Sequence, residues 1–324
     1  MTDANSDFGM HFKSINYVGL EPGPRLIVLG AVHGNETCGT EAIHRVMEDI
    51  DRGRLRLVSG SITLVPVTNP LAYARATREG ERNLNRNLYP SAHPADFEDH
   101  IANWLCPLLA QHQVLLDLHS FHTGGEAFVM LGPENNQGEL EPFAHAAEEQ
   151  ALARHLGVRR FVDGWLDTYA RGVERRAGSV GRLPGKAVTD ARYGVGTTEY
   201  MRSVGGYGLT LECGQHDDPQ APELAYRAIL NTLSWLGLSN QLKPPAATDV
   251  QALRICEVID KQHEADCFAR EWASFDRLRA GDTIGTRHDG TVVAAQHDGF
   301  IVFPNPNAGA GQEWFYLAIA RPGV

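Results

Sequence analysis

Apolar and polar positions alternate in two different ways between about residue 25 and residue 240. Short, almost continuous apolar runs, typical of strands covered on both faces, occupy residues 25–32, 61–67, 113–120 and 208–213. Stretches with apolar residues three and four positions apart, which predict amphipathic helices, occupy residues 37–51, 96–112, 140–157 and 221–238. This alternation predicts an α/β fold in which helices flank a mostly parallel or mixed sheet.

The pattern changes near residue 240. Residues 239–250 are polar, contain paired prolines and lack periodicity, which is typical of a linker. Between residues 281 and 320, glycine, aspartate and asparagine turns separate β-branched and aromatic runs at short intervals, which predicts a small all-β unit. We therefore expect two domains, residues 1–243 with the α/β pattern and residues 244–324 as a β-rich C-terminal domain.

The formal net charge of −11 argues against nucleic acid and anionic membranes as partners, because no basic stripe offsets it. The five cysteines are odd in number and form no Cys-x-x-Cys pair, which is typical of reduced thiols in the cytoplasm. The first 14 residues do not have the basic and apolar regions of a signal peptide. No uncharged apolar run approaches the roughly 20 residues of a membrane span. These features predict a soluble, cytoplasmic protein and leave a homo-oligomer open.

Ionisable side chains lie at the ends of three of the apolar runs. His33 follows the first run and Glu36 comes three residues later, His119 ends the third run, and Glu212 lies near the end of the fourth. Because ligands in open α/β sheets bind beyond the carboxyl ends of the strands, we expect these groups to meet at one edge of the sheet.

Two histidines and a carboxylate are a donor set that suits a catalytic zinc ion, which takes three protein ligands and a water molecule. A tight turn at Gly34 can bring His33 and Glu36 to one point, and His119 can complete the set. Asp117 shares a strand face with His119 and can orient it. From these residues alone, a metal site and an ordinary buried polar cluster remain equally open.

Five short motifs follow one another along the chain: GAVHGNE at 30–36, Asn-Pro at 69–70, TREGERNLNR at 77–86, LLDLHS at 115–120 and LTLECG at 209–214. Their order resembles that in the succinylglutamate desuccinylase/aspartoacylase family, which belongs to the larger zinc carboxypeptidase-like group. The resemblance covers nearly the whole chain. It implies a zinc carboxypeptidase-like fold in which the C-terminal domain narrows access to the active site.

The resemblance also implies roles for individual residues. It places one zinc ion per chain on His33, Glu36 and His119, and the general base on Glu212. Zinc lowers the pKa of water toward ~7, and a nearby carboxylate can carry the released proton to the leaving amine. Burial of the Glu212 carboxylate in an apolar strand costs desolvation free energy, which favours a catalytic role over a purely structural one.

The Asn-Arg pair that binds substrate in this family matches Asn85 and Arg86, and the planar guanidinium of Arg86 suits a substrate carboxylate. An arginine that polarises the scissile carbonyl matches Arg78, which can share the oxyanion charge with the metal. Arg75 and Arg82 lie close by in the sequence, so a surface role for any of the three arginines stays open.

Together these residues predict a zinc-dependent amidohydrolase that removes an acyl group from an N-acylated amino acid or a related small amine. An acetyl or succinyl acyl group fits, and an N-acetyl-diaminobutyrate type of substrate is also compatible. Two other readings are a carboxypeptidase-type peptide hydrolase and a non-catalytic metal- or ligand-binding protein on the same fold.

Some features leave the prediction incomplete. The family often has Asp-Leu-Asn-Arg where residues 83–86 read Asn-Leu-Asn-Arg, which removes a negative charge and prevents a carry-over of substrate specificity. His122 and His216 contact either substrate or only neighbouring protein groups. Residues 163–195, rich in glycine and arginine, form either a lid or an irregular surface segment. The sequence HEADC at 263–267 has a cysteine where a zincin helix needs its second histidine, so we discount it as a metal site.

Overall fold

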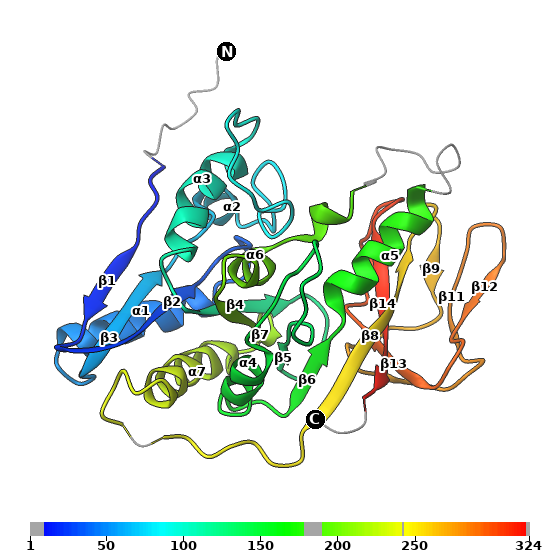
Figure 1. The fold of residues 1–324 in the computed structure, drawn as a ribbon. Coiled ribbons are helices and arrows are strands. Elements are labelled where there is room, and N and C mark those ends of the chain that lie inside the picture. The colour runs from blue at the N-terminus through cyan, green and yellow to red at the C-terminus, as the bar shows by residue number, and fades with distance from the viewer. Residues whose placement is uncertain (1–9, 178–189, 242, 322–324) are drawn as a thin grey trace.

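The computed structural model describes residues 10–177, 190–241 and 243–321, which build one 11-stranded mixed sheet with helices against its faces and a second, three-stranded sheet (Figure 1). The strands are β1 Ile15–Val18, β2 Glu21–Leu29, β3 Ser59–Val65, β4 Val114–Phe121, β5 Phe128–Met130, β6 Arg160–Asp163, β7 Tyr207–Gln215, β8 Gln251–Asp260, β9 Cys267–Phe268, β10 Arg277–Leu278, β11 Thr283–Thr286, β12 Val292–Ala294, β13 Gly299–Val302 and β14 Glu313–Ala320. The helices are α1 Cys38–Asp51, α2 Pro70–Arg75, α3 Phe97–Leu109, α4 Ala146–Ala153, α5 Trp165–Ala177, the 3-10 helix η1 Ala191–Gly194, α6 Thr197–Ser203 and α7 Ala221–Trp235.

Four neighbouring strands of the large sheet, in the order β3, β2, β4 and β7, run parallel to one another. Side chains of β2 alternate between two cores: Leu26 and Val28 pack with α1 and α7, whereas Ile27 and Leu29 pack with α3. Because both faces are covered, these strands appear in the sequence as continuous apolar runs. The predicted fold class, a mixed sheet flanked by helices, is confirmed.

The strands of the C-terminal part extend the same sheet. Strand β8 pairs in parallel with β6, and β14, β13 and β10 follow it as antiparallel strands. A separate antiparallel sheet has the order β12-β11-β9. Residues 243–321 contain strands and no helix, as the spacing of turns predicted. The division of the chain into two domains at residue 243 remains a prediction.

The glycine- and arginine-rich segment 163–195 begins at the end of β6 and continues through α5, which lies against β8. A hydrogen bond from the Thr168 hydroxyl to the Ile255 carbonyl oxygen, 2.9 Å long, ties α5 to that strand. The expected lid or surface segment includes residues 178–189, which lie outside the described residues, so both readings stay open.

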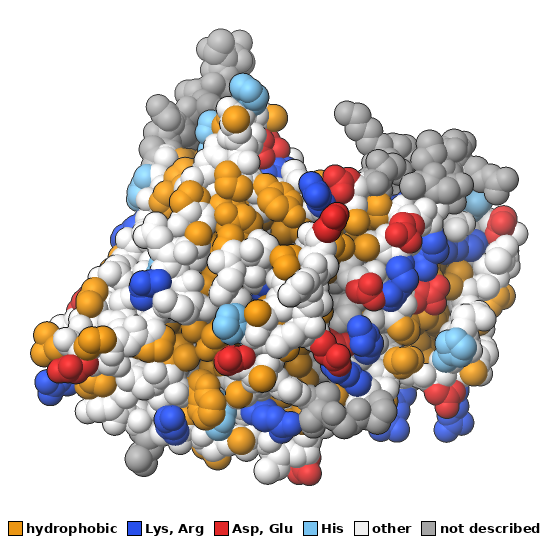
Figure 2. Space-filling model, viewed as in Figure 1, with side chains coloured by type: hydrophobic (Ala, Val, Ile, Leu, Met, Phe, Trp, Pro, Cys, Tyr) orange, Lys and Arg blue, Asp and Glu red, His pale blue; other side chains and the backbone are white. Residues whose placement is uncertain are grey.

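On the face drawn in Figure 2, acidic and basic side chains intermingle over the C-terminal strands at the right of the view. Among the helices that the structure describes, none is both long and apolar enough to cross a bilayer.

Candidate functional site

The loop after β2 brings His33 and Glu36 together. Gly34 lies so close to α2 that a Cβ atom at this position would be 2.0 Å from the Ala72 carbonyl carbon, so only glycine fits here. Helix α2 is started by the Asn-Pro motif: the Asn69 side chain accepts a hydrogen bond from the Ala72 N–H, and Pro70 occupies the first helical turn. The turn is closed by a 3.2 Å hydrogen bond from the Glu36 N–H to the His33 carbonyl oxygen.

His119, near the end of β4, completes a cluster with these two residues. His33 Nδ1 lies 2.9 Å from Glu36 Oε1, and His119 Nδ1 lies 2.8 Å from Glu36 Oε2. One donor atom from each of the three side chains lies within 4.8 Å of the others, and all three residues are buried. The structure therefore brings together the three residues that the sequence nominated as metal ligands.

In each histidine, the ring nitrogen that does not face Glu36, Nε2, lies close to a polar side chain. The Asn83 Oδ1 atom accepts the Asn85 backbone N–H at 2.9 Å, so it is the carboxamide oxygen, and it lies 3.0 Å from His33 Nε2. His33 therefore donates from Nε2 and keeps the lone pair on Nδ1, the atom that faces Glu36. Asp117 Oδ2 lies 2.9 Å from His119 Nε2, the place expected for an orienting carboxylate.

The buried carboxylates Glu36 and Asp117 make the cluster favourable for positive charge. Burial and the neighbouring Arg78 lower the pKa of His33 to about 4, so its imidazole is neutral, as a ligand must be. Burial works against the charged form of Glu36, but His33 and His119 hold the pKa of that carboxyl well below its usual range. Burial likewise opposes charge on His119, yet Asp117 and Glu36 raise the pKa of the imidazole well above its ordinary value. Two buried carboxylates thus concentrate negative charge at this point.

The donor atoms themselves fit a metal ion. Among the described residues, His33 Nδ1 has no hydrogen-bond partner, although Glu36 Oε1 is 2.9 Å away. Two lone-pair donors that approach without sharing a proton are arranged as ligands of one ion would be. Two imidazoles and one carboxylate suit zinc, and other divalent transition metals accept the same set.

Of the three neighbouring arginines, Arg78 reaches this cluster. Its Nη1 atom donates to Glu36 Oε1 at 2.9 Å, and its side chain is 49% exposed. Arg75 instead donates to the Gly80 carbonyl oxygen, and Arg82 pairs with Asp96 and Asp99. The structure therefore places Arg78 beside the candidate metal ligands and the other two away from them.

Glu212 lies next to the cluster on β7, where its Cα is the register partner of His119. The residue is buried, and no described residue forms a hydrogen bond with its carboxylate. Burial raises the pKa of Glu212 to about 8, a shift to which Glu36 adds and which His119 opposes. A carboxylate without partners, poised to hold a proton, is what a general base or acid needs.

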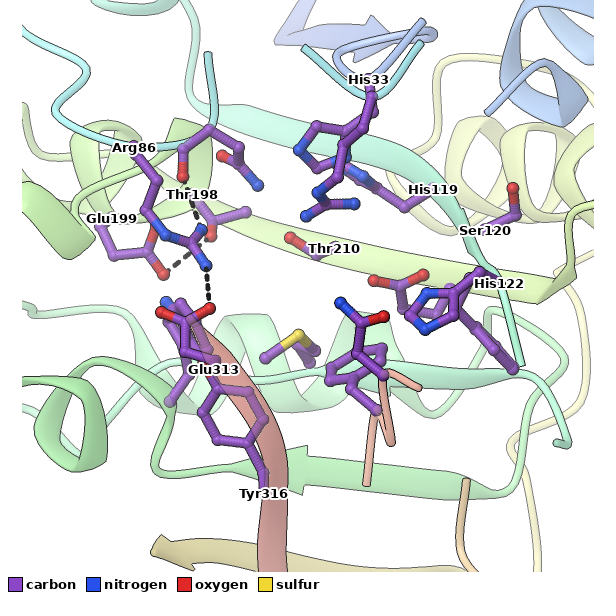
Figure 3. Close-up of a pocket in the computed structure, with 18 of the residues that line it drawn as sticks. His33, Arg86, His119, Ser120, His122, Thr198, Glu199, Thr210, Glu313 and Tyr316 are labelled. Carbon is purple, nitrogen blue, oxygen red and sulfur yellow. Dashed lines mark hydrogen bonds and ion pairs between the residues drawn. The ribbon is translucent and has the colours of Figure 1, made fainter. Parts of the chain in front are cut away.

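A cavity extends from the cluster and is lined by both predicted substrate-binding residues, Asn85 and Arg86. The carboxamide oxygen of Asn85 accepts the Thr197 N–H at 2.9 Å, which leaves its amide nitrogen to donate to a ligand. The Arg86 guanidinium carbon lies 4.6 Å from the centre of the Trp165 ring and 5.6 Å from that of Tyr169. In Figure 3, Arg86 lies beside Glu199 and Glu313 on one side of the cavity, with His33 and His119 on another.

The two additional histidines differ in position. His122 lines the cavity, and its Nε2 atom lies 3.2 Å from the Pro304 carbonyl oxygen. His216 contacts neighbouring protein groups: its Nδ1 lies 2.8 Å from the Ser120 hydroxyl oxygen and its Nε2 lies 3.4 Å from Asn35 Nδ2. Burial lowers the pKa of both imidazoles.

Several residues at this site were not predicted from the sequence. Asn83 was noted only as a departure from a motif, and its contact with His33 depends on a loop fold that no local pattern reveals. Trp165 comes from α5, whereas Glu313 and Tyr316 come from β14 of the C-terminal part. An aromatic run at residues 314–316 was visible in the sequence, but it predicted a strand and not a cavity wall.

Comparison with known proteins gives one family. Residues 22–159 match the model of the succinylglutamate desuccinylase/aspartoacylase catalytic domain. The chain is also similar to a succinylglutamate desuccinylase of Pseudoalteromonas atlantica, with 23% identity over 301 residues, 89% of this chain and 79% of that protein.

Solved structures of low sequence identity share the fold. One is a succinylglutamate desuccinylase/aspartoacylase from Rhodobacter sphaeroides, with a TM-score of 0.71, 18% identity, and coverage of 96% of this chain and 90% of that chain. Another is a succinylglutamate desuccinylase from Vibrio cholerae, with a TM-score of 0.70, 18% identity, and coverage of 95% and 85%. A third is the product-bound ectoine utilization protein EutE (DoeB) from Ruegeria pomeroyi, with a TM-score of 0.67, 17% identity, and coverage of 92% and 86%.

Proposed function

We propose, on the premise that this chain belongs to the succinylglutamate desuccinylase/aspartoacylase family through the catalytic domain at residues 22–159, that it is a zinc-dependent amide hydrolase. Its substrates are N-acylated amino acids or related small amines, and one zinc ion is held per chain. The observation that carries the proposal is the convergence of His33, Glu36 and His119 beside the unpartnered carboxylate of Glu212.

When bound by His33, Glu36 and His119, zinc supplies a Lewis acid that makes water a nucleophile near neutral pH. Glu212 takes a proton from the attacking water and delivers it to the leaving amine. Its carboxylate is free for this task, since no described residue forms a hydrogen bond with it.

Arg78 places a guanidinium beside the same cluster, where it stabilises the negative charge that develops on the scissile carbonyl oxygen. Arg86 and Asn85 bind a carboxylate of the substrate. The planar guanidinium of Arg86 pairs with both carboxylate oxygens, and the neutral side-chain amide of Asn85 donates a further hydrogen bond. Asn83 and Asp117 hold the two histidine rings in orientation.

The shape of the cavity favours small substrates over peptides. Phe303, Asn305, Glu313 and Tyr316 of the C-terminal part line the cavity together with residues of the catalytic domain. A peptide-trimming enzyme needs an open groove, whereas a wall from the C-terminal part limits the length of the chain that can enter. All five cysteines are unpaired, which supports a cytoplasmic location.

The test is a comparison of hydrolysis rates for the zinc-loaded protein. N-acetyl and N-succinyl amino acids are the candidate substrates, and unmodified dipeptides serve as the comparison. Release of free amino acid from at least one N-acyl amino acid, faster than cleavage of the dipeptides, is the expected result. Faster cleavage of dipeptides, or no hydrolysis of any N-acyl amino acid, would overturn the proposal.

A further inference from the structure

Thr197 is a buried residue that lies between the metal ligands and the substrate-binding residues of the candidate site. It is the first residue of α6, a helix that lies against β4 and β7 (Figure 1). Its neighbours Thr198 and Glu199 line the cavity, whereas Thr197 is 0% exposed and lies behind the cavity wall. A hydroxyl buried in this way needs a hydrogen-bond partner inside the protein.

The partner of this hydroxyl is the carboxylate of Asp117 on β4. Thr197 Oγ1 donates to Asp117 Oδ2, since a hydroxyl can donate and a carboxylate oxygen can only accept. Asp117 is also 0% exposed, and its other oxygen, Oδ1, has no hydrogen-bond partner among the described residues. Within the part of the chain that the structure describes, the Thr197 hydroxyl is therefore the group that holds this buried carboxylate in place.

The oxygen that Thr197 holds is the one that lies beside a candidate metal ligand. Asp117 Oδ2 lies 2.9 Å from His119 Nε2. His119 Nε2 forms no hydrogen bond of good geometry with any described residue, so the ring depends on the position of Oδ2 for its orientation. A carboxylate can orient a histidine only if the carboxylate is itself held in place. The orientation of His119 therefore depends on Thr197 through Asp117.

The backbone of Thr197 contacts the other half of the site. Its N–H donates to Asn85 Oδ1 at 2.9 Å, which is possible because the N–H of the first residue of a helix has no partner within that helix. The approach is so close that a Cβ atom at Gly196 would lie 2.1 Å from the same oxygen. A 3.0 Å hydrogen bond from the Leu88 N–H to the Val195 carbonyl oxygen ties the two segments together. Thr197 thus orients the side-chain amide of Asn85 as well.

We propose that Thr197 is a positioning residue of the hydrolytic site, whose hydroxyl orients the metal ligand His119 through Asp117 and whose N–H orients Asn85. The two contacts can be separated by mutation, because one is made by the side chain and the other by the backbone. Loss of the hydroxyl weakens metal binding and leaves the Asn85 contact in place. This inference rests on the proposed function and adds a residue to the same site.

The test compares Thr197→Val, which keeps the branched shape and the N–H but has no hydroxyl, with Thr197→Ser, which keeps the hydroxyl. Zinc affinity, measured by competition with a chelating dye, should fall by about 10-fold in Thr197→Val and stay near the wild-type value in Thr197→Ser. Thr232→Val is the matched control, because Thr232 on α7 is equally buried and its hydroxyl donates to the Ala228 carbonyl oxygen at 2.8 Å. This control should keep the wild-type zinc affinity.

Two further readouts separate positioning from a loss of stability. Cobalt(II) absorbs visible light according to the arrangement of its ligands, so the spectrum of the cobalt-loaded protein should change in Thr197→Val and match the wild type in Thr197→Ser. With saturating zinc and an N-acyl amino acid that the wild type hydrolyses, kcat of Thr197→Val should fall by about 10-fold. KM should stay unchanged, because Asn85 keeps its N–H partner.

Wild-type zinc affinity and an unchanged cobalt spectrum in Thr197→Val would overturn the inference and leave the proposed function intact. An equal loss of zinc affinity in Thr197→Ser or in Thr232→Val would also overturn it, because the loss would then not depend on the hydroxyl at position 197. Zinc binding that is weakened only in Thr197→Val supports the inference even if no N-acyl amino acid is hydrolysed; in that case the proposed function alone fails. A wild-type protein that binds no zinc contradicts both.

Discussion

His119 and Glu212 are register partners on the adjacent parallel strands β4 and β7, so the candidate metal ligand and the candidate base project side by side from one face of the sheet. The arrangement needs no flexible loop to assemble it, since both residues lie in buried strands. A site built on strands keeps its geometry better than one built on loops.

Replacement of Glu212 by glutamine tests the role of this neighbour. The amide has the size of the carboxylate but cannot accept the water proton, so kcat should fall by roughly 10²- to 10⁴-fold. Zinc content should stay at the wild-type level, because Glu212 is not among the three ligands. Steady-state kinetics and elemental analysis of the same preparation measure both quantities. If Glu212→Gln retains full activity, Glu212 is not the base.

Asn83 should control the strength of metal binding through His33. Asn83→Ala removes the acceptor that lies 3.0 Å from His33 Nε2, so the ring loses the partner that fixes its tautomer and orientation. Zinc affinity should fall by about 10- to 100-fold. A competition titration with a chelating dye measures this directly. Asn83→Asp keeps an oxygen acceptor and should retain tight binding; equal weakening in both variants would refute the orienting role.

Arg78 and Arg75 form a matched pair for testing charge stabilisation. Arg78 contacts Glu36, whereas Arg75 donates to a backbone oxygen away from the cluster. Arg78→Ala should lower kcat by on the order of 10²-fold with zinc retained, since it removes a cation from the position where negative charge develops. Arg75→Ala should leave kcat near the wild-type value. If kcat falls by a similar factor in both variants, the loss reflects a general effect of positive charge and not a specific role of Arg78.

Asp266 should stabilise the C-terminal part of the chain in a pH-dependent way. This buried carboxylate accepts hydrogen bonds from Arg287 Nη1 at 2.8 Å and from the N–H groups of Gln262 and His288 at 2.8 and 2.9 Å. Burial opposes its ionisation, but these donors hold the pKa of Asp266 well below its usual range. Asp266→Asn should lower the free energy of unfolding by about 2 kcal/mol at pH 7.

The sign of the pH effect follows from that lowered pKa. An Asp in the unfolded chain has a pKa near about 3.9, so the folded state binds fewer protons and the stabilisation is complete above that value. It is lost as the pH falls toward the folded pKa. Urea unfolding of wild type and Asp266→Asn should therefore show a difference at pH 7 that shrinks below about pH 4. A constant difference across this range would mean that the carboxylate charge is not involved.

The sequence predicted the features that depend on local apolar pattern, namely the parallel strands and the residues at their ends. The runs that became β2, β3, β4 and β7 are apolar because both faces of the sheet are covered. A parallel sheet places the ends of such strands at one edge, which is why His33, Glu36 and His119 could be expected to meet. The proximity of Arg78 to Glu36 was expected only through the order of motifs, and spacing alone could not choose it over Arg75 or Arg82.

Other features depend on contacts between residues far apart in the sequence. The pairing of β8 with β6 joins the C-terminal strands to the main sheet, and no local signal marks the edge at which a strand will dock. Glu313 reaches the cavity for the same reason, 227 positions after Arg86 (313 minus 86). The partner of His33 was hidden because Asn83 lies in an irregular loop whose course is set by tertiary contacts.

The most direct test of the account is the metal content of protein purified without added metal, measured by elemental analysis. We predict close to one zinc ion per chain in the wild type and its loss in His33→Ala, which removes one of the three converging donors. His44→Ala, on the exposed side of α1, is the matched control and should retain the metal. A wild-type protein that holds no metal, even after zinc is added and the excess removed, would contradict the account, as would a His33→Ala variant that keeps a full complement of zinc.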